Sequence, residues 1–151
     1  MHEARLYEKR DGNQVKCHLC AHGCLIDDGG RGICHVRENR GGTLYTLVYE
    51  QVLAEHIDPI EKKPLYHVAP GSLSYSIATA GCNFRCGWCQ NADISAMPRD
   101  QRIIRGVRIP PGLVVERACG ARCRSIAYTY TAPTIYFEYA CDVAQGLSLI
   151  P

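Results

Sequence analysis

The sequence predicts an α/β protein in which a small cysteine-rich segment, residues 1–70, precedes the start of an α/β core over residues 71–151. From residue 72 onward, strand-like and helix-like segments follow in the order strand, cysteine loop, helix, strand, helix. This order makes two β/α units, and the usual right-handed crossover makes their strands parallel. The second observation is that seven of the ten cysteines fall into two short motifs, where we expect the chemistry of the protein.

Length and composition set bounds on both fold and function. A chain of 151 residues has the length of one domain, and with 46% apolar residues it can bury a core. A net charge of +2 is too small to indicate nucleic-acid binding. The first twenty residues lack the apolar stretch of a signal peptide, and no run is as long as a membrane span. We therefore expect a cytoplasmic protein without membrane contact, in which ten cysteines indicate metal ligands or catalytic thiols rather than disulfides.

The sequence pattern predicts secondary structure least clearly in the amino-terminal part of the chain. Residues 1–16 are polar and mixed in charge, and we interpret them as a lead segment only. Residues 43–57 begin with β-formers, and Leu44, Thr46 and Val48 share one face, which predicts a half-buried strand or hairpin. Between them and the core, the charges from Asp58 to Lys63 stand among prolines and predict a solvated loop.

The core elements are bounded by proline and glycine. Residues 73–79 alternate apolar and small polar residues and predict a strand, which Gly81 ends by letting the backbone turn. The arginines recurring every third residue from Arg99 to Arg108 indicate a solvated connection, because Gly106 and two prolines break any helix. The remaining predicted elements are a helix over 112–119, a strand over 123–131 and a helix over 134–144 that Gly146 stops. Cys119, Cys123 and Cys141 fall in these elements and are predicted to be small buried apolar residues.

The strongest chemical signal is the loop after the first core strand. Cys82, Cys86 and Cys89 stand at C-x3-C-x2-C spacing, so three thiols are presented at the carboxyl end of a strand, where α/β folds place their chemistry. Soft thiolates select zinc, copper(I) or iron–sulfur clusters. A closed zinc site needs four ligands, and a [4Fe–4S] cluster usually takes four cysteines. Three ligands in one loop leave an open metal position for a substrate or cofactor, unless zinc takes a fourth ligand from elsewhere.

A second cysteine group precedes it. Cys17, Cys20, Cys24 and Cys34 follow C-x2-C-x3-C-x9-C spacing, with glycines between them that allow tight turns. Four thiolates at this spacing can close a tetrahedral site. Zinc and an accessory iron–sulfur cluster both fit, and a reduced cysteine cluster without metal is the remaining alternative.

The cysteine loop and its flanks resemble a known family. The segments are Asp58-Pro-Ile-Glu-Lys-Lys-Pro-Leu-Tyr-His67, Pro70-Gly-Ser72, Cys82-Asn-Phe-Arg-Cys86, Cys89-Gln-Asn91 and Ile94-Ser95. With the amino-terminal cysteines they resemble the radical S-adenosylmethionine (SAM) superfamily, in particular the AmmeMemoRadiSam-system radical SAM enzymes, which are relatives of the pyruvate formate-lyase activating enzymes. The resemblance extends from about Cys17 to Ala144.

The resemblance implies a fold, a cofactor pair and a reaction. The fold would be a partial (β/α)6 barrel; a full eight-unit barrel takes roughly 250 residues, so two units look like the amino-terminal part of a longer enzyme. Cys82, Cys86 and Cys89 would each hold one iron of a [4Fe–4S] cluster, which reductively cleaves SAM to a 5′-deoxyadenosyl radical for hydrogen abstraction. Implied partners are an electron donor such as flavodoxin or ferredoxin, Memo-like and AMMECR-like proteins, or a complementing chain.

Two positions depart from the family pattern, and two other function classes stay open. Ala132 replaces the acidic residue of a Tyr-Thr-Tyr-x-Glu-Pro segment that meets the SAM amino group in related enzymes, and Ala92 replaces an aromatic residue.

Phe84 and Trp88 lie between the ligands, where they either shield the cluster or pack the loop on the core. The alternatives to an enzyme are a zinc-binding interaction module and a small iron–sulfur electron carrier.

Overall fold

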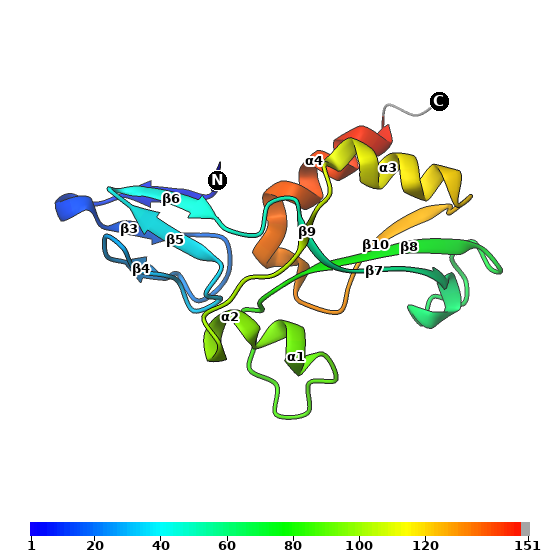
Figure 1. The fold of residues 1–151 in the computed structure, drawn as a ribbon, viewed down its shortest axis with the longest axis horizontal. Coiled ribbons are helices and arrows are strands. Elements are labelled where there is room, and N and C mark those ends of the chain that lie inside the picture. The colour runs from blue at the N-terminus through cyan, green and yellow to red at the C-terminus, as the bar shows by residue number, and fades with distance from the viewer. Residues whose placement is uncertain (149–151) are drawn as a thin grey trace.

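The computed structural model describes residues 1–148 of the chain. Three sheets are present among these residues: two small ones of three strands each at one end of the molecule, and one of four strands at the other (Figure 1). The strands of the small sheets are β1 (His2–Glu3), β2 (Tyr7–Lys9), β3 (Val15–Cys17), β4 (Leu25–Ile26), β5 (Arg37–Arg40) and β6 (Thr43–Thr46). The small sheets have the orders β1-β6-β5 and β2-β3-β4.

The larger sheet carries the predicted core. Its order is β10-β8-β7-β9, formed by β7 (Gln51–Pro59), β8 (Leu73–Thr79), β9 (Val107–Arg108) and β10 (Ser125–Tyr128). β10 pairs with β8 in parallel, which confirms the predicted parallel pairing, and β7 pairs with β8 antiparallel. The predicted boundary at residue 70 thus falls between two neighbouring strands of one sheet.

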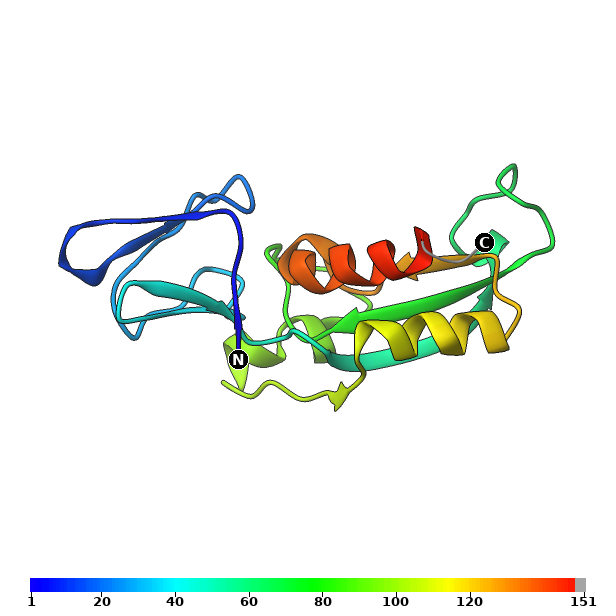
Figure 2. The ribbon, with the colours of Figure 1, turned by 90° about the horizontal axis from the view of Figure 1, so that it is seen from above.

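Two helices cover one face of this sheet, as Figures 1 and 2 show together. They are α3 (Pro111–Gly120) and α4 (Phe137–Ser148), and α4 follows the 3-10 turn η3 (Pro133–Tyr136). Successive side chains of a strand point to opposite faces, so Tyr75 and Ile77 of β8 enter the core with Val114 of α3 and Tyr139 of α4. Ser74 and Ser76 therefore point to the opposite face of the sheet.

The prediction of a structureless lead over residues 1–16 was wrong. This segment forms β1, β2, the 3-10 turn η1 (Asp11–Asn13) and most of β3. Strands of two or three residues with mixed charge carry no periodic signal, and they form here by pairing with β6 and β4, which lie later in the chain. The single strand or hairpin predicted over residues 43–57 is instead two strands, β6 and β7, in different sheets. Leu44, Thr46 and Val48, predicted to share one face, are all buried.

Some boundaries of the core elements also differ from the predictions. The arginine-rich connection contains α1 (Ala92–Ser95), α2 (Met97–Asp100) and strand β9, and the strand predicted over 123–131 is regular only in β10. Gly146 does not stop the last helix, since α4 continues to Ser148. A Cβ at Gly146 would lie 3.3 Å from Val115 Cγ2, so this glycine lets α4 approach α3 closely.

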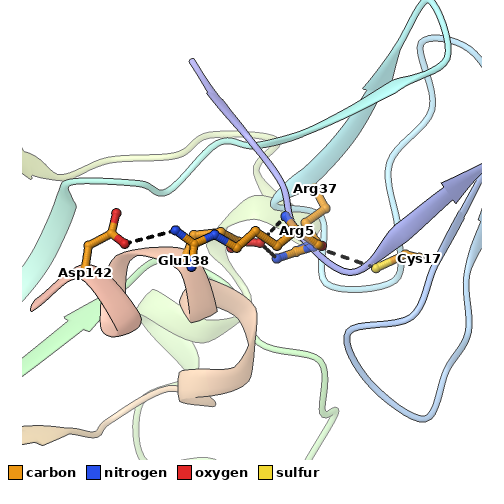
Figure 3. Close-up of polar contacts among 5 residues, drawn as sticks. All are labelled: Arg5, Cys17, Arg37, Glu138 and Asp142. Atoms are coloured by element: carbon orange, nitrogen blue, oxygen red, sulfur yellow. Dashed lines mark hydrogen bonds and ion pairs between the residues drawn. The ribbon is translucent and has the colours of Figure 1, made fainter. Parts of the chain in front are cut away.

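A buried ion pair joins the small sheets to α4 (Figure 3). Arg37 of β5 is 1% exposed, and its guanidinium donates to Glu138 Oε1, while Glu138 is itself fully buried. The same carboxylate oxygen accepts the backbone N–H of Arg5 at 2.6 Å, and Arg37 Nη1 donates to the Arg5 carbonyl at 3.0 Å. This buried pair of charges is therefore one of the contacts that fix the small sheets relative to α4.

None of the helices within residues 1–148 combines the length and apolar character that crossing a membrane requires.

Candidate functional site

The loop with Cys82, Cys86 and Cys89 begins directly after β8, as predicted. Gly81 makes the turn with φ of +97°, a conformation that L side chains rarely adopt, and its N–H donates to the Ile94 carbonyl at 3.0 Å. A Cβ at this position would lie 2.6 Å from Val36 Cγ1 and 3.2 Å from the Cys34 carbonyl oxygen. The turn is therefore packed tightly against the amino-terminal segment.

We expect Gly81→Ala to destabilise the chain by about 1–3 kcal/mol, because it adds a methyl group where there is no space and forces a positive φ on a residue with a Cβ. Equilibrium unfolding in urea would measure this cost. Gly87→Ala is the matched control, since no atom lies within 4 Å of a Cβ at Gly87 and its φ is not positive. Equal stability of Gly81→Ala and Gly87→Ala would contradict the packing argument.

The three thiols line one cavity of about 230 Å³. Its other lining residues include Phe84, Arg85, Ser95 and Arg99, and Cys86 is exposed. The Arg99 guanidinium pairs with Asp100, whereas Arg85 has no ion-pair partner within residues 1–148. Arg85 therefore adds a positive charge to the lining of the cavity that holds the three thiols.

Polar groups of the loop approach the sulfur atoms. The Phe84 N–H donates to Cys82 Sγ at 3.4 Å, and Cys89 Sγ lies 3.4 Å from Ser95 Oγ. In the part of the chain that the structure describes, no three His, Cys, Asp or Glu side chains come together closely enough for one metal ion. The ligands of an iron–sulfur cluster are spread over several iron atoms, so such a cluster does not need them to meet at one point.

The end of the loop is fixed to the segment that follows β10, and a second bond joins that segment to the end of β8. Asn91 Nδ2 donates to the Tyr130 carbonyl at 3.0 Å, and Thr131 Oγ1 donates to the Thr79 carbonyl at 3.1 Å. Asn91 thus anchors the loop on the sheet, a role that agrees with the stabilisation of turns by asparagine.

The two aromatic residues of the loop do not pack it on the core. Phe84 is 63% exposed and Trp88 is 87% exposed. Phe84 lines the cavity with the thiols, and its shielding of a cluster stays a prediction.

The four amino-terminal cysteines Cys17, Cys20, Cys24 and Cys34 come together around a second cavity of about 20 Å³. Cys24 Sγ accepts the Ile33 N–H at 3.5 Å, and Arg37 Nη1 lies 4.0 Å from Cys17 Sγ. Burial raises the pKa of the Cys34 thiol. The spacing therefore grouped these residues correctly, although their side chains do not converge on a single point.

The two cysteine groups adjoin one another. His22 Nε2 lies within hydrogen-bond distance, 2.8 Å, of the carbonyl oxygen of Asn83, the residue after Cys82. Asn83 also lines the small cavity of the amino-terminal cysteines. A change in either group can therefore reach the other through Asn83.

The scattered cysteines behave differently from the prediction. Cys119 is exposed, and Cys123 and Cys141 are half-buried, so none of them is a fully buried apolar residue. Cys119 lies on the solvent side of α3, whose buried residues are Val114, Val115 and Ala118.

Sequence reasoning missed a polar cluster around Asp58. The predicted solvated charge run was wrong here, because Asp58 is 4% exposed and its carboxylate accepts from Lys62, Lys63, Ser76 and Tyr130. Burial alone would raise the pKa of Asp58, but these four donors outweigh it and hold the pKa well below its usual range. No local pattern signalled this cluster, because Ser76 and Tyr130 reach Asp58 only when β7 pairs with β8.

Comparisons with known proteins give relatives without an assigned function. The uncharacterized protein MJ0808 of Methanocaldococcus jannaschii is 47% identical over 144 residues, which cover 95% of this chain and 43% of the relative. The uncharacterized protein MJ0674 of the same organism is 33% identical over 89 residues, covering 58% of this chain and 21% of that protein. No protein-family model and no solved structure matches the chain. The chain thus spans well under half the length of either curated relative.

Proposed function

We propose that this chain provides the cluster-binding part of a radical SAM enzyme of the AmmeMemoRadiSam-system type. The observation that carries the proposal is that Cys82, Cys86 and Cys89 line one surface-accessible cavity at the carboxyl end of β8. Three thiols in one loop match a [4Fe–4S] cluster that keeps one iron free of protein ligands. A bound cluster would supply the electron for the reductive cleavage of SAM, the chemistry that the family resemblance implies.

The residues around the thiols have supporting roles in this proposal. Arg85 offsets the negative charge of thiolate ligands, and the Phe84 N–H to Cys82 Sγ and the Ser95 hydroxyl beside Cys89 Sγ tune the sulfur atoms through hydrogen bonds. Asn91 holds the loop on Tyr130 at the end of β10. The open side of the cavity leaves access for SAM and for an acidic electron donor such as flavodoxin or ferredoxin.

Binding of the SAM ammonium group is the weakest part of the fit. Ala132 stands where related enzymes have an acidic residue, and the next carboxylate along the chain, Glu138, is buried against Arg37. SAM would therefore be bound mainly through the cluster and through residues outside this chain. A complementing chain, or Memo-like and AMMECR-like proteins, are the partners that we propose for the whole system.

The amino-terminal cysteines form a second proposed metal site. Cys17, Cys20, Cys24 and Cys34 surround one small cavity, and backbone and guanidinium N–H groups face two of the four sulfurs. A thiolate set of this kind suits zinc or an iron–sulfur cluster. Zinc would require the four side chains to turn inward and meet at one ion. Metal analysis of the purified chain distinguishes zinc from an iron–sulfur cluster at this site.

We expect the anaerobically purified chain, reconstituted with iron and sulfide, to give a reduced [4Fe–4S] EPR signal that changes when SAM is added. SAM binding to the open iron alters the electronic environment of the cluster and hence its spectrum. Metal and acid-labile sulfide contents would be measured on the same sample. The matched control is S-adenosylhomocysteine, which lacks the sulfonium charge.

Each outcome of this experiment separates two function classes. A cluster signal that SAM leaves unchanged would contradict the SAM-binding part and favour an electron carrier. Zinc at both cysteine groups, with no iron–sulfur signal after reconstitution, would overturn the proposal in favour of a zinc-binding interaction module.

A further inference from the structure

The face of the large sheet opposite α3 and α4 is polar. Register places Asp58 of β7 beside Ser74 of β8 and Ser74 beside Ser125 of β10, so the three side chains form one row across this face. The next row contains His56, Ser76 and Ala127. Helices α3 and α4 lie on the other side of the sheet (Figure 1), yet Ser74 and Ser76 are fully buried on this face. A face lined by hydroxyl and charged groups is not built to pack against an apolar layer.

Asp58 organises the outer part of this face, and its carboxylate has no free acceptor site. Its Oδ1 accepts Lys62 Nζ at 2.8 Å, and its Oδ2 accepts Lys63 Nζ at 2.6 Å, Ser76 Oγ at 2.8 Å and the Tyr130 hydroxyl at 2.8 Å. A carboxylate offers about four acceptor sites. A further cation at Asp58 would therefore have to displace an ammonium group.

The two lysines exceed the charge of the one carboxylate. Lys63 is 11% exposed, and its ammonium also lies 5.1 Å from the centre of the Tyr130 ring, so Lys63 is committed to the cluster. Lys62 is 61% exposed and adds a second positive charge, with His56 exposed on the same face. Each ammonium has three N–H donors and uses one on Asp58, so both lysines keep N–H donors for a ligand.

The segment that carries the lysines is held in place before any ligand binds. The Ile60 N–H donates to the Ser72 carbonyl at 2.9 Å, and Glu61 Oε1 accepts the Gly71 N–H at 2.7 Å. Ile60 is buried. Donors fixed in this way lose little conformational entropy when they bind a ligand.

Tyr130 connects this cluster to the cysteine loop. Its hydroxyl donates to Asp58, and its carbonyl accepts the Asn91 side chain from the end of that loop. A ligand bound at the Asp58 cluster would therefore be connected to the cysteine loop through Tyr130.

We propose that Lys62, Lys63 and His56, held in place by Asp58 and Tyr130, form a binding site for an oxyanion group, a carboxylate or phosphate, of a small-molecule ligand. Calling this ligand the substrate rests on the proposed radical SAM function. Binding of the anion does not rest on that function, because it requires neither iron nor SAM.

Titration of the 15N-labelled chain with inorganic phosphate, and separately with malonate, tests the site by NMR. We expect saturable shifts of the backbone amides of residues 61–63 and 130, beyond those that sodium chloride causes at equal ionic strength. The anion that saturates at lower concentration distinguishes a phosphate-bearing from a carboxylate-bearing ligand.

Two variants make the test specific. Lys62→Met is expected to weaken binding by about tenfold or more, since a hydrogen bond to a charged group contributes roughly 1.5–3 kcal/mol. Lys9→Met, which removes an equally exposed charge from β2, should leave the affinity unchanged.

The proposal is overturned if neither anion shifts these amides more than sodium chloride does. It is also overturned if Lys9→Met weakens binding as much as Lys62→Met, since that would show a general charge effect. Either failure leaves the EPR result on the cysteine loop unaffected, so the two proposals are tested independently.

Discussion

Glu138→Ala is expected to lower the free energy of unfolding by about 3–5 kcal/mol, the range observed when one partner of a buried ion pair is removed. Arg37 would stay buried at 1% exposure without its carboxylate. The Arg5 N–H would lose its acceptor as well, because it shares Glu138 Oε1 with Arg37 (Figure 3). Urea unfolding followed by circular dichroism measures the change.

The pair need not be a net source of stability for this loss to be large. Arg37 Nε and Glu138 Oε2 are buried without a hydrogen-bond partner in the described part of the chain, so the pair is imperfectly satisfied. Arg37→Met combined with Glu138→Leu should therefore recover most of the loss. Glu116→Ala, at an exposed position of α3, is the control and should change stability by no more than about 0.5 kcal/mol. A cost below about 1 kcal/mol for Glu138→Ala would contradict the burial argument.

Cys86→Ala is expected to abolish the [4Fe–4S] EPR signal of the cysteine loop and to reduce bound iron by about four atoms per chain, the content of one such cluster. With two thiols remaining, two irons would lack a protein ligand. Because Cys86 is exposed, its replacement should leave stability almost unchanged, so loss of the cluster would not reflect unfolding. Iron analysis, sulfide analysis and EPR on one sample measure the effect.

Cys119→Ala is the matched control for this prediction, because Cys119 is also exposed but lies on α3, away from both cysteine groups. It should retain full iron and the full signal. Unchanged iron and an unchanged signal in Cys86→Ala would show that the loop does not hold the cluster. If the amino-terminal cysteines hold a second cluster, its iron and signal should persist in Cys86→Ala.

Local spacing was enough to locate the cysteine loop and the elements around it. Alternation predicted β8, proline and glycine predicted α3, and the positive φ of Gly81 follows from the need to turn into the loop. The crossover rule then made β8 and β10 parallel. These features depend on residues close in sequence, so their signals survive in the sequence alone.

The features that were missed depend on residues far apart in the chain. Strands β1 and β2 are too short to show a period and form only by pairing with later segments. The Arg37–Glu138 pair joins positions 101 residues apart, and Tyr130 reaches Asp58 across 72 residues. No local pattern reports such contacts.

The sequence by itself therefore determined which thiols lie together, because the spacing of cysteines within one loop is a local property. Only the tertiary structure decided which charges are buried. Asp58, Lys62 and Lys63 look like a solvated run until β7 pairs with β8 and brings Ser76 and Tyr130 to the carboxylate. Whether a charge faces water depends on what packs over it, and the chain supplies those groups only when it folds.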